Sequence, residues 1–293
     1  MPFETIVPPL TPFTEQGRVD YDRLPGLVNF VVEDSRANMV MAAGVEAQEY
    51  QYLTMEERKE LVRKTIEVVG GRTKVAVGIT HPSFRIAIEL AHLAEELGAD
   101  AVQLLAPQKP TGGVPTTGEL VRYFESVGRE TSLPIILYLN AGPGADLTIQ
   151  QTVELAKLDR ITAVKESSRD LSRVSRLIAE IDQAGHAKYL TTMQMLLITL
   201  QLGGSGVTLP PPASRLARRV IDAYEAGDLT RATALQRQFA LFPAQWMPFG
   251  LAAVMKAALN HLGVPAGEPY PPYSPVAGEA LDRLKAHLDT IEI

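Results

Sequence analysis

Eight short apolar runs recur along the first 209 residues, separated by longer stretches whose apolar residues have helical spacing. One of these stretches opens with Thr54 and Glu57, which have the spacing of a capping box. Strands that alternate with helices pair in parallel, so the pattern predicts eight β/α units. The predicted strands cover residues 5–10, 38–43, 74–80, 101–106, 133–140, 161–165, 189–192 and 206–209.

Eight such units in 293 residues predict an α/β fold, a closed (β/α)8 TIM barrel with a C-terminal helical appendage. An open doubly wound sheet is the alternative, but the chain reads PPLTP after the first strand, where a dinucleotide-binding sheet has G-x-G-x-x-G. Prolines have no backbone N–H to give to a pyrophosphate, which disfavours this alternative. Beyond residue 213 only helices are predicted, so we expect a barrel domain over residues 1–226 and a helical region over residues 227–293. The predicted helices cover residues 215–225, 229–241, 247–262 and 276–291.

Charge and composition argue against several classes of function. The net charge is −6 and the basic residues are scattered, so the chain offers no basic stripe for nucleic acid. No apolar run approaches the roughly 18 residues of a membrane span, and residues 1–9 lack the features of a signal peptide. Cysteine is absent, which excludes disulfides and thiolate sites and fits a reducing compartment. We therefore expect a cytoplasmic protein that binds neither nucleic acid nor membrane.

Metal and phosphate sites also find little support in the sequence. The five histidines are dispersed, without H-x-x-x-H or H-x-H spacing, so no metal site is predicted. A divalent ion held only by Glu46, Glu49 and waters is the alternative that remains. Barrels of this kind often bind phosphate in the loops after strands seven and eight, but here three prolines follow the eighth strand at residues 210–212. This disfavours pyridoxal phosphate and sugar phosphates.

The active site of a (β/α)8 barrel lies at the carboxyl ends of its strands, so the side chains there are the candidates for chemistry. Lys165 is the most informative, because it ends the apolar run ITAV and a lysine is rarely buried unless it is paired. It either pairs with Glu166 or another carboxylate, or it is a desolvated amine that forms a Schiff base with a carbonyl substrate. The other strand-end candidates are Glu46, Gln48, Glu49, Thr80, His81, Gln108, Lys109, Tyr138, Asn140, Ser167, Thr192 and Thr208.

Tyr138 favours the Schiff-base interpretation. The fifth and sixth strands are neighbours in such a barrel, so their ends would place the Tyr138 phenol near the Lys165 amine. A phenol within hydrogen-bond reach can relay protons while a carbinolamine forms and during the later bond-breaking step. The alternative role for Tyr138 is structural, as an amphipathic tyrosine at the barrel end that anchors Asn140.

Several segments carry a resemblance that extends over nearly the whole chain. They include VPPLTPFTEQGRVDYDRL at residues 7–24, LPIILYLN at 133–140, ITAVKESSRDLSRV at 161–174, the last strand with the helix after it at 203–236, and FGLAAVMKAALNHLGVPAGEPYPPYSP at 249–275. These segments resemble the dihydrodipicolinate synthase and N-acetylneuraminate lyase family of Schiff-base barrels. The resemblance implies Lys165 as the Schiff-base lysine and Tyr138 as its proton relay. It also implies a homotetramer or homodimer that acts on pyruvate or another 2-oxo acid without a cofactor.

The chain departs from this family at three strand ends. After the second strand the family usually reads G-T-T-G-E, whereas this chain reads VEAQE at residues 45–49, so Glu46 would stand where a hydroxyl of the proton relay is expected. Glu46 is then a general base or a stabiliser of the cationic iminium, or else a surface carboxylate paired with a basic side chain. Backbone N–H groups near Ala47, together with Gln48, would still bind a substrate carboxylate. The P-Y-Y pair after the fourth strand and the arginine of N-x-P-G-R-T-G after the fifth are both missing. We therefore do not predict dihydrodipicolinate synthase activity itself.

The leading hypothesis is a class I lyase in which Lys165 forms a Schiff base with pyruvate or a longer 2-oxo acid, with an aldehyde as the partner in aldol cleavage or condensation. Tyr138 would shuttle protons, together with Glu46, and the side chains of Asn140, Ser167 and Thr208 would orient the substrate. The same chemistry permits dehydration of a 3-deoxy-2-oxo sugar acid, and the sequence does not decide between the two outcomes. An alternative of another class is a 2-oxo-acid-binding barrel without turnover, which steady-state formation of a carbonyl product would rule out.

Overall fold

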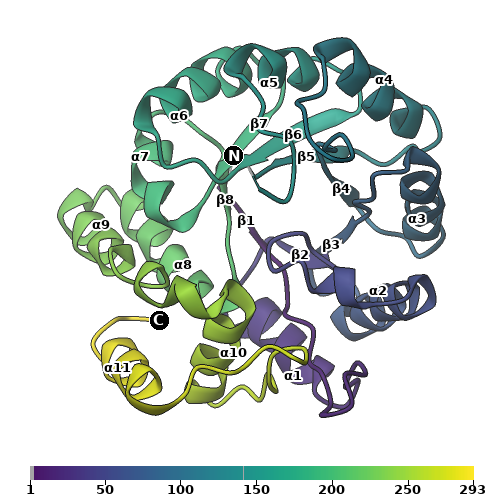
Figure 1. The fold of residues 1–293 in the computed structure, drawn as a ribbon. Helices are drawn as coiled ribbons and strands as arrows, with labels where there is room; N and C mark the ends of the chain where they lie inside the picture. The colour runs from purple at the N-terminus through teal and green to yellow at the C-terminus, as the bar shows by residue number, and fades with distance from the viewer. Residues whose placement is uncertain (1–2, 141) are drawn as a thin grey trace. The chain divides into compact units, whose positions relative to one another are not determined.

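The computed structural model describes residues 3–140 and 142–293. Its strands form a closed barrel in the order β1 to β8, which confirms the predicted α/β barrel (Figure 1). The strands are β1 (Glu4–Val7), β2 (Met39–Ala42), β3 (Lys74–Gly78), β4 (Ala101–Leu105), β5 (Ile135–Leu139), β6 (Ile161–Glu166), β7 (Lys188–Thr191) and β8 (Gly206–Thr208).

The α-helices of the described ranges alternate with the strands up to β8 and then follow one another, as predicted. They are α1 (Leu24–Asn29), α2 (Met55–Val69), α3 (Phe84–Glu96), α4 (Thr117–Gly128), α5 (Ile149–Ala156), α6 (Leu171–Leu177), α7 (Leu196–Gln201), α8 (Pro211–Glu225), α9 (Leu229–Gln236), α10 (Leu251–His261) and α11 (Gly278–Leu288).

Some boundaries differ from the prediction for local reasons. β1 ends at Val7 rather than at residue 10, because Pro8 and Pro9 have no N–H to donate to a neighbouring strand. The helix predicted to begin at residue 247 begins at Leu251 instead. Gly250 has a φ of 86°, which no helix accepts, and the residues before it form a separate 3-10 helix.

By its internal contacts the chain divides into two compact units. One comprises the N-terminal residues to Glu4 together with Lys74–Thr208, and the other comprises Thr5–Thr73 together with Leu209–Ile293. The predicted boundary between a barrel domain and a helical region after residue 226 stays a prediction. α8 ends at Glu225, immediately before it.

The first unit contains the consecutive parallel strands β3 to β8. β4 and β5 are buried at every position, as expected for parallel strands that are covered on both faces. The registers pair Leu105 with Tyr138, Tyr138 with Lys165, and Lys165 with Leu190. Side chains of residues that are paired in register leave the sheet on the same face. Tyr138 and Lys165, two of the three residues that the sequence predicts for catalysis, therefore share one row.

The second unit contains the parallel pair β1 and β2, in which Ile6 lies opposite Met39, and the helices α1, α2 and α8 to α11. The predicted capping box of α2 is confirmed. The Thr54 hydroxyl accepts a hydrogen bond of 3.2 Å from the backbone N–H of Glu57, whose carboxylate accepts one of 3.0 Å from the N–H of Thr54.

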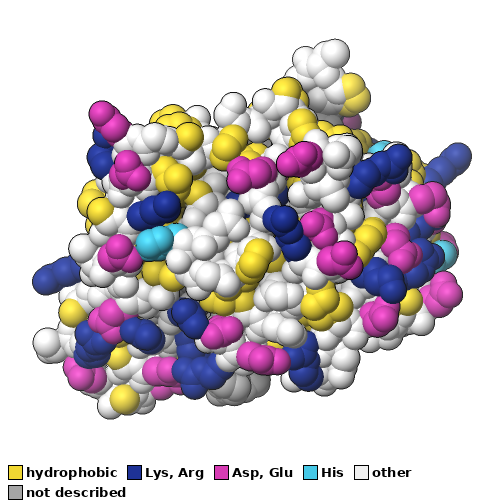
Figure 2. Space-filling view, turned by 90° about the horizontal axis from the view of Figure 1, so that it is seen from below, with side chains coloured by type: hydrophobic (Ala, Val, Ile, Leu, Met, Phe, Trp, Pro, Cys, Tyr) yellow, Lys and Arg dark blue, Asp and Glu magenta, His cyan; other side chains and the backbone are white. Residues whose placement is uncertain are grey.

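On the molecular face drawn in Figure 2, basic and acidic side chains are interspersed rather than gathered by sign. Ion pairs along single helices also bring opposite charges together, among them Lys64 with Glu67 and Arg129 with Glu125. None of the helices in the described ranges is both long and apolar enough to cross a bilayer.

Candidate active site

Lys165 lies near the carboxyl end of β6 and is only 3% exposed. Successive side chains of a strand point to opposite faces. Glu166, the next residue, contacts Arg173 of the covering helix α6, so Lys165 points to the opposite face, which is the interior of the barrel. A buried amine at this place is what the sequence predicts.

The Lys165 amine lies among the hydroxyl groups of Tyr138 and Ser167. Its Nζ donates hydrogen bonds of 2.6 Å to Ser167 Oγ and 3.3 Å to Tyr138 Oη, and it lies 4.3 Å from the centre of the Tyr138 ring. Asn140 Nδ2 donates to Tyr138 Oη at 3.3 Å, and the Tyr138 and Ser167 oxygens are 3.4 Å apart. The structure thus brings together four of the predicted site residues.

The pairing of Lys165 with Glu166, which the sequence left open, is wrong. The Glu166 carboxylate lies on the outer face of β6, where Arg173 Nε and the Tyr189 hydroxyl donate to its two oxygens. The Tyr189 distance is 2.9 Å. Burial, followed by the nearby Glu166 charge, raises the pKa of Tyr189 far above its usual range, so its hydroxyl remains a donor. The sequence pattern singles out neither Arg173 nor Tyr189, because their link to Glu166 depends on the packing of α6 and β7 against β6.

A polar layer lies one step beyond the row that contains Lys165. Lys165 is paired with Leu190, and Leu190 with Gly206, so Thr208 is on the same face as Ser167 by the two-residue period of strands. The Thr208 hydroxyl is buried, at 1% exposure of the residue, and has no hydrogen-bond partner among the described residues. Asn140, Ser167 and Thr208 form this layer, and they are three of the residues predicted to bind substrate.

Other strand-end candidates of this unit have structural contacts. The Thr80 hydroxyl accepts a 3.0 Å hydrogen bond from the backbone N–H of Leu105 and so links β3 to β4. Gln108 Nε2 donates to the carbonyl oxygens of Gly142 and Gly144, both at 2.7 Å, and so holds the loop after β5. Lys109 forms an exposed ion pair with Glu119 at 3.0 Å.

Glu46, Ala47 and Gln48 belong to the second unit, in the segment that follows β2. All three are partly exposed, and Gln48 has a left-handed backbone with a φ of 56°. Glu46 Oε2 lies so close to Gly44 that a β-carbon built on Gly44 would stand 2.8 Å from it. Their predicted roles toward the substrate stay predictions.

Glu49 is a structural residue rather than an exposed metal ligand. It is 3% exposed, and its Oε1 lies 2.8 Å from the amine of Lys256 on α10, while its Oε2 accepts a 2.8 Å hydrogen bond from the N–H of Thr11. The Lys256 amine also donates to the carbonyl oxygens of Thr11 and Glu268, at 2.8 and 3.0 Å. Burial raises the pKa of Glu49, and the charge of Lys256 opposes this shift. In the described part of the chain no group of three His, Cys, Asp or Glu side chains is placed to hold a metal ion.

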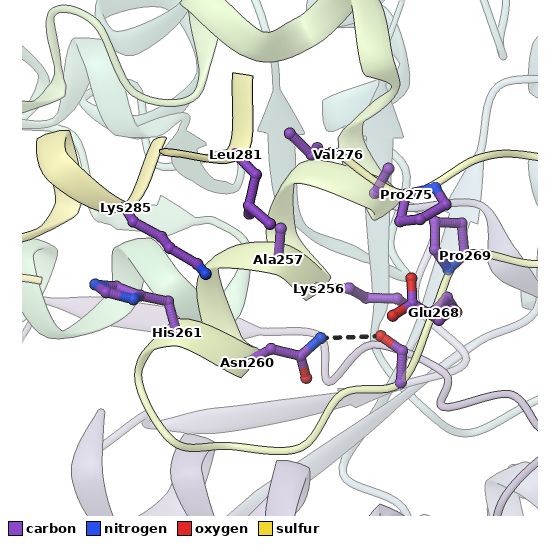
Figure 3. A pocket seen from close by; sticks show the side chains of 12 residues that line it. Lys256, Ala257, Asn260, His261, Glu268, Pro269, Pro275, Val276, Leu281 and Lys285 are labelled. Atoms are coloured by element: carbon purple, nitrogen blue, oxygen red, sulfur yellow. Dashed lines mark hydrogen bonds between the residues drawn. The ribbon is translucent and has the colours of Figure 1, made fainter. Parts of the chain in front are cut away.

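Figure 3 shows a cavity of about 320 Å³ in the second unit, between α10 and the segments that follow it. Asn260 Nδ2 donates to the carbonyl oxygen of Gly267 at 3.1 Å. His261 Nε2 lies within hydrogen-bond distance of the Asp289 carboxylate, at 2.8 Å. Lys256 also lines this cavity, although its amine is engaged by Glu49. The polar groups named here thus anchor the C-terminal segments.

A smaller cavity of about 190 Å³ lies at the carboxyl ends of β5 and β6. Its lining includes Asn140 and Ser167, which contact Tyr138 and Lys165, and the charged residues Asp146, Glu166 and Arg173. Arg173 forms an ion pair with Glu166, so the exposed Asp146 carboxylate leaves the lining of this cavity with a net negative charge.

The sequence profile of the Dihydrodipicolinate synthetase family matches residues 2–291. A 4-hydroxy-tetrahydrodipicolinate synthase of Moorella thermoacetica is 31% identical over 283 residues, which cover 95% of this chain and 94% of that protein. Among solved structures, a prophage protein of the dihydrodipicolinic acid synthase family from E. coli, in complex with pyruvate, is 26% identical with a TM-score of 0.87 and 98% of each chain covered. An N-acetylneuraminate lyase of Mycoplasma synoviae shares the fold, with 22% identity, a TM-score of 0.83 and coverage of 98% of this chain and 96% of that one.

Proposed function

Because the chain belongs to the dihydrodipicolinate synthetase family, we propose that it is a class I lyase whose Lys165 forms a Schiff base with pyruvate or a related 2-oxo acid. The observation that carries this proposal is the buried Lys165 amine within hydrogen-bond reach of the Tyr138 phenol. A lysine desolvated in this way keeps more of its uncharged form than an exposed one.

The proposed reaction begins at Lys165. The free Lys165 amine attacks the keto carbon, and the carbinolamine loses its oxygen as water to leave an iminium cation. In aldol cleavage, the bond between C3 and C4 breaks while a base takes the proton of the C4 hydroxyl, which gives an aldehyde and an enamine. The enamine takes a proton at C3, and water then hydrolyses the iminium to release the 2-oxo acid and the amine. In our proposal Tyr138 carries these protons, and the contacts of its hydroxyl with Lys165 and Asn140, both at 3.3 Å, support this role. Condensation is the reverse of this sequence.

The second substrate is, in our proposal, a neutral hydroxylated aldehyde or the matching 2-oxo sugar acid. The polar layer of Asn140, Ser167 and Thr208 supports this, because amide and hydroxyl groups match hydroxylated chains. The unpartnered Thr208 hydroxyl is a further reason, since buried polar groups are normally hydrogen-bonded. The segment after β5 lacks the arginine of N-x-P-G-R-T-G, which disfavours an aldehyde that carries a carboxylate. A dehydratase acting on a 3-deoxy-2-oxo sugar acid would use the same layer, and its products would distinguish it from an aldolase.

Borohydride trapping tests the proposal directly. The protein is incubated with pyruvate and borohydride, the intact mass is measured, and the modified peptide is mapped. We expect one reduced pyruvate adduct on Lys165, lost in Lys165→Ala and retained in Lys157→Ala, whose amine is exposed and paired with Glu154. Absence of an adduct with pyruvate and with longer 2-oxo acids would overturn the proposal. An adduct without any carbonyl product across hydroxylated substrates would instead favour the 2-oxo-acid-binding barrel.

We also propose that the enzyme works in the cytoplasm as a homotetramer or homodimer. The absence of cysteine and the family membership support these two points. Light scattering of the purified protein at several concentrations measures the assembly, and a monomer at all of them would refute it.

A further inference from the structure

The sequence places a carboxylate directly after the reactive lysine. Glu166 is 4% exposed, and its side chain leaves β6 on the face opposite Lys165. A negative charge in a buried region interacts over several ångströms, because the effective dielectric constant there is well below that of water. An uncompensated Glu166 charge would therefore favour the ammonium form of Lys165, which cannot attack a carbonyl group.

The structure compensates this charge on the outer face of β6. Arg173 Nε donates to Glu166 Oε1, and the Tyr189 hydroxyl donates to Oε2 at 2.9 Å. Arg173 is itself held by a contact of 3.4 Å to the hydroxyl of Thr152 on α5. The Arg173 side chain is 19% exposed and that of Glu166 is 5% exposed, so solvent screens this pair little.

Most of the other charged groups on the elements beside β6 belong to ion pairs. The Tyr138 hydroxyl faces Lys165 itself. The charged groups on the neighbouring elements are Glu154 of α5, paired with Lys157; Arg176 of α6, paired with Glu180; Lys188 of β7, paired with Glu4; and Asp146 in the loop after β5.

We propose that Arg173 is a positioning residue for catalysis: it compensates the charge of Glu166 and so keeps the amine of Lys165 in its reactive, uncharged form. This inference rests on the proposed Schiff-base function. It assigns a role in reactivity to a side chain that lies on the helix-covered side of the strand, away from the substrate.

The test is the pH profile of pyruvate trapping by borohydride in two variants that remove opposite charges. Arg173→Met leaves Glu166 uncompensated, so the midpoint of trapping moves to higher pH. Glu166→Gln leaves Arg173 uncompensated, so the midpoint moves to lower pH. Unit charges roughly 10 Å apart, at an effective dielectric constant of about 20, shift a titration by about one pH unit. Below the midpoint this is a change of about tenfold in trapping rate, down for Arg173→Met and up for Glu166→Gln.

Two further variants separate charge from structure. Arg173→Lys keeps the charge and is expected to stay within about threefold of the parent, and the double variant Glu166→Gln with Arg173→Met returns the midpoint toward its original value. Arg176→Met, on the same helix but exposed, is the matched control. If Arg173→Met does not fold, the pH midpoint of trapping in Glu166→Gln still tests the inference.

Midpoints that move in the same direction in both charge variants, or that do not move in Glu166→Gln, would overturn the inference. In either case the pyruvate adduct on Lys165 of the parent protein would still stand. Absence of that adduct in the parent would instead refute the proposed function, so the two failures are distinguishable.

Discussion

Replacing Tyr138 with phenylalanine removes one oxygen atom from the centre of the candidate site and leaves the ring in place. The contacts of the hydroxyl include those of 3.3 Å from Lys165, 3.3 Å from Asn140 and 3.4 Å to Ser167. These contacts are long for hydrogen bonds, so we expect the free energy of unfolding to fall by only about 1 kcal/mol. The ring, which is 2% exposed and faces the Lys165 amine at 4.3 Å, retains its packing.

The expected kinetic effect is much larger than the effect on stability. General acid–base catalysis contributes typically 10²- to 10⁴-fold, which corresponds to roughly 2.7 to 5.4 kcal/mol in the activation barrier. We therefore predict that Tyr138→Phe lowers kcat by 10²- to 10⁴-fold, while slow borohydride trapping still labels Lys165. Denaturant unfolding, steady-state product formation and intact mass measure the three quantities.

Tyr224→Phe on α8, outside the candidate site, is the matched control and is expected to keep the parental kcat. A Tyr138→Phe enzyme with a kcat within tenfold of the parent and an unchanged unfolding free energy would refute the proton-relay role. A variant that loses several kcal/mol of stability would show instead that the hydroxyl has a structural role.

Further predictions concern stability and substrate binding. Thr208→Val removes a buried hydroxyl that has no hydrogen-bond partner in the described part of the chain, so we expect the free energy of unfolding to rise by up to about 1 kcal/mol while the KM for a hydroxylated 2-oxo acid rises. An unchanged KM would contradict the role of Thr208 in binding. Lys256→Met leaves Glu49 buried and uncompensated, which is expected to cost about 3 to 5 kcal/mol at neutral pH in urea unfolding, and adding Glu49→Leu should recover most of this loss. In Lys256→Met the pKa of Glu49 is raised by burial, so the folded state binds more protons than the unfolded state, and stability falls as the pH rises above about 4.3; a stability that rises over this range would contradict the assignment. Thr54→Ala breaks the capping box of α2 and is expected to cost about 1 kcal/mol, with Thr54→Ser as the conservative control.

The sequence is informative about this fold because the local signals for strands, helices and helix ends all agree with the order of elements in a (β/α)8 barrel. The period of the apolar residues changes from that of a strand to that of a helix in each of eight β/α units, and capping residues such as Thr54 mark where a helix begins. Strand ends were harder to predict, as at β1, because apolar character continues into Pro8 and Pro9 while hydrogen bonding does not.

Lys165 and Tyr138 could be identified from the sequence because a lysine in an apolar strand is rare and because neighbouring strands of a barrel end together. The contacts of Glu166 could not be predicted in the same way. Lys165 and Glu166 are adjacent in the chain, yet the pleat of the strand sends their side chains to opposite faces. Only the packing of α6 and β7 against β6 brings Arg173 and Tyr189 to Glu166.

The sequence by itself therefore determined the order of the elements, the class of the barrel and which two residues we propose as the reactive pair, because periodicity and residue type are local properties. The tertiary structure alone decided which charges meet. Arg173 reaches Glu166 from the helix that packs on β6, and Lys256 reaches Glu49 from more than 200 residues away. Such pairs form where the chain excludes water, and the exclusion of water is a property of the packed fold rather than of any segment.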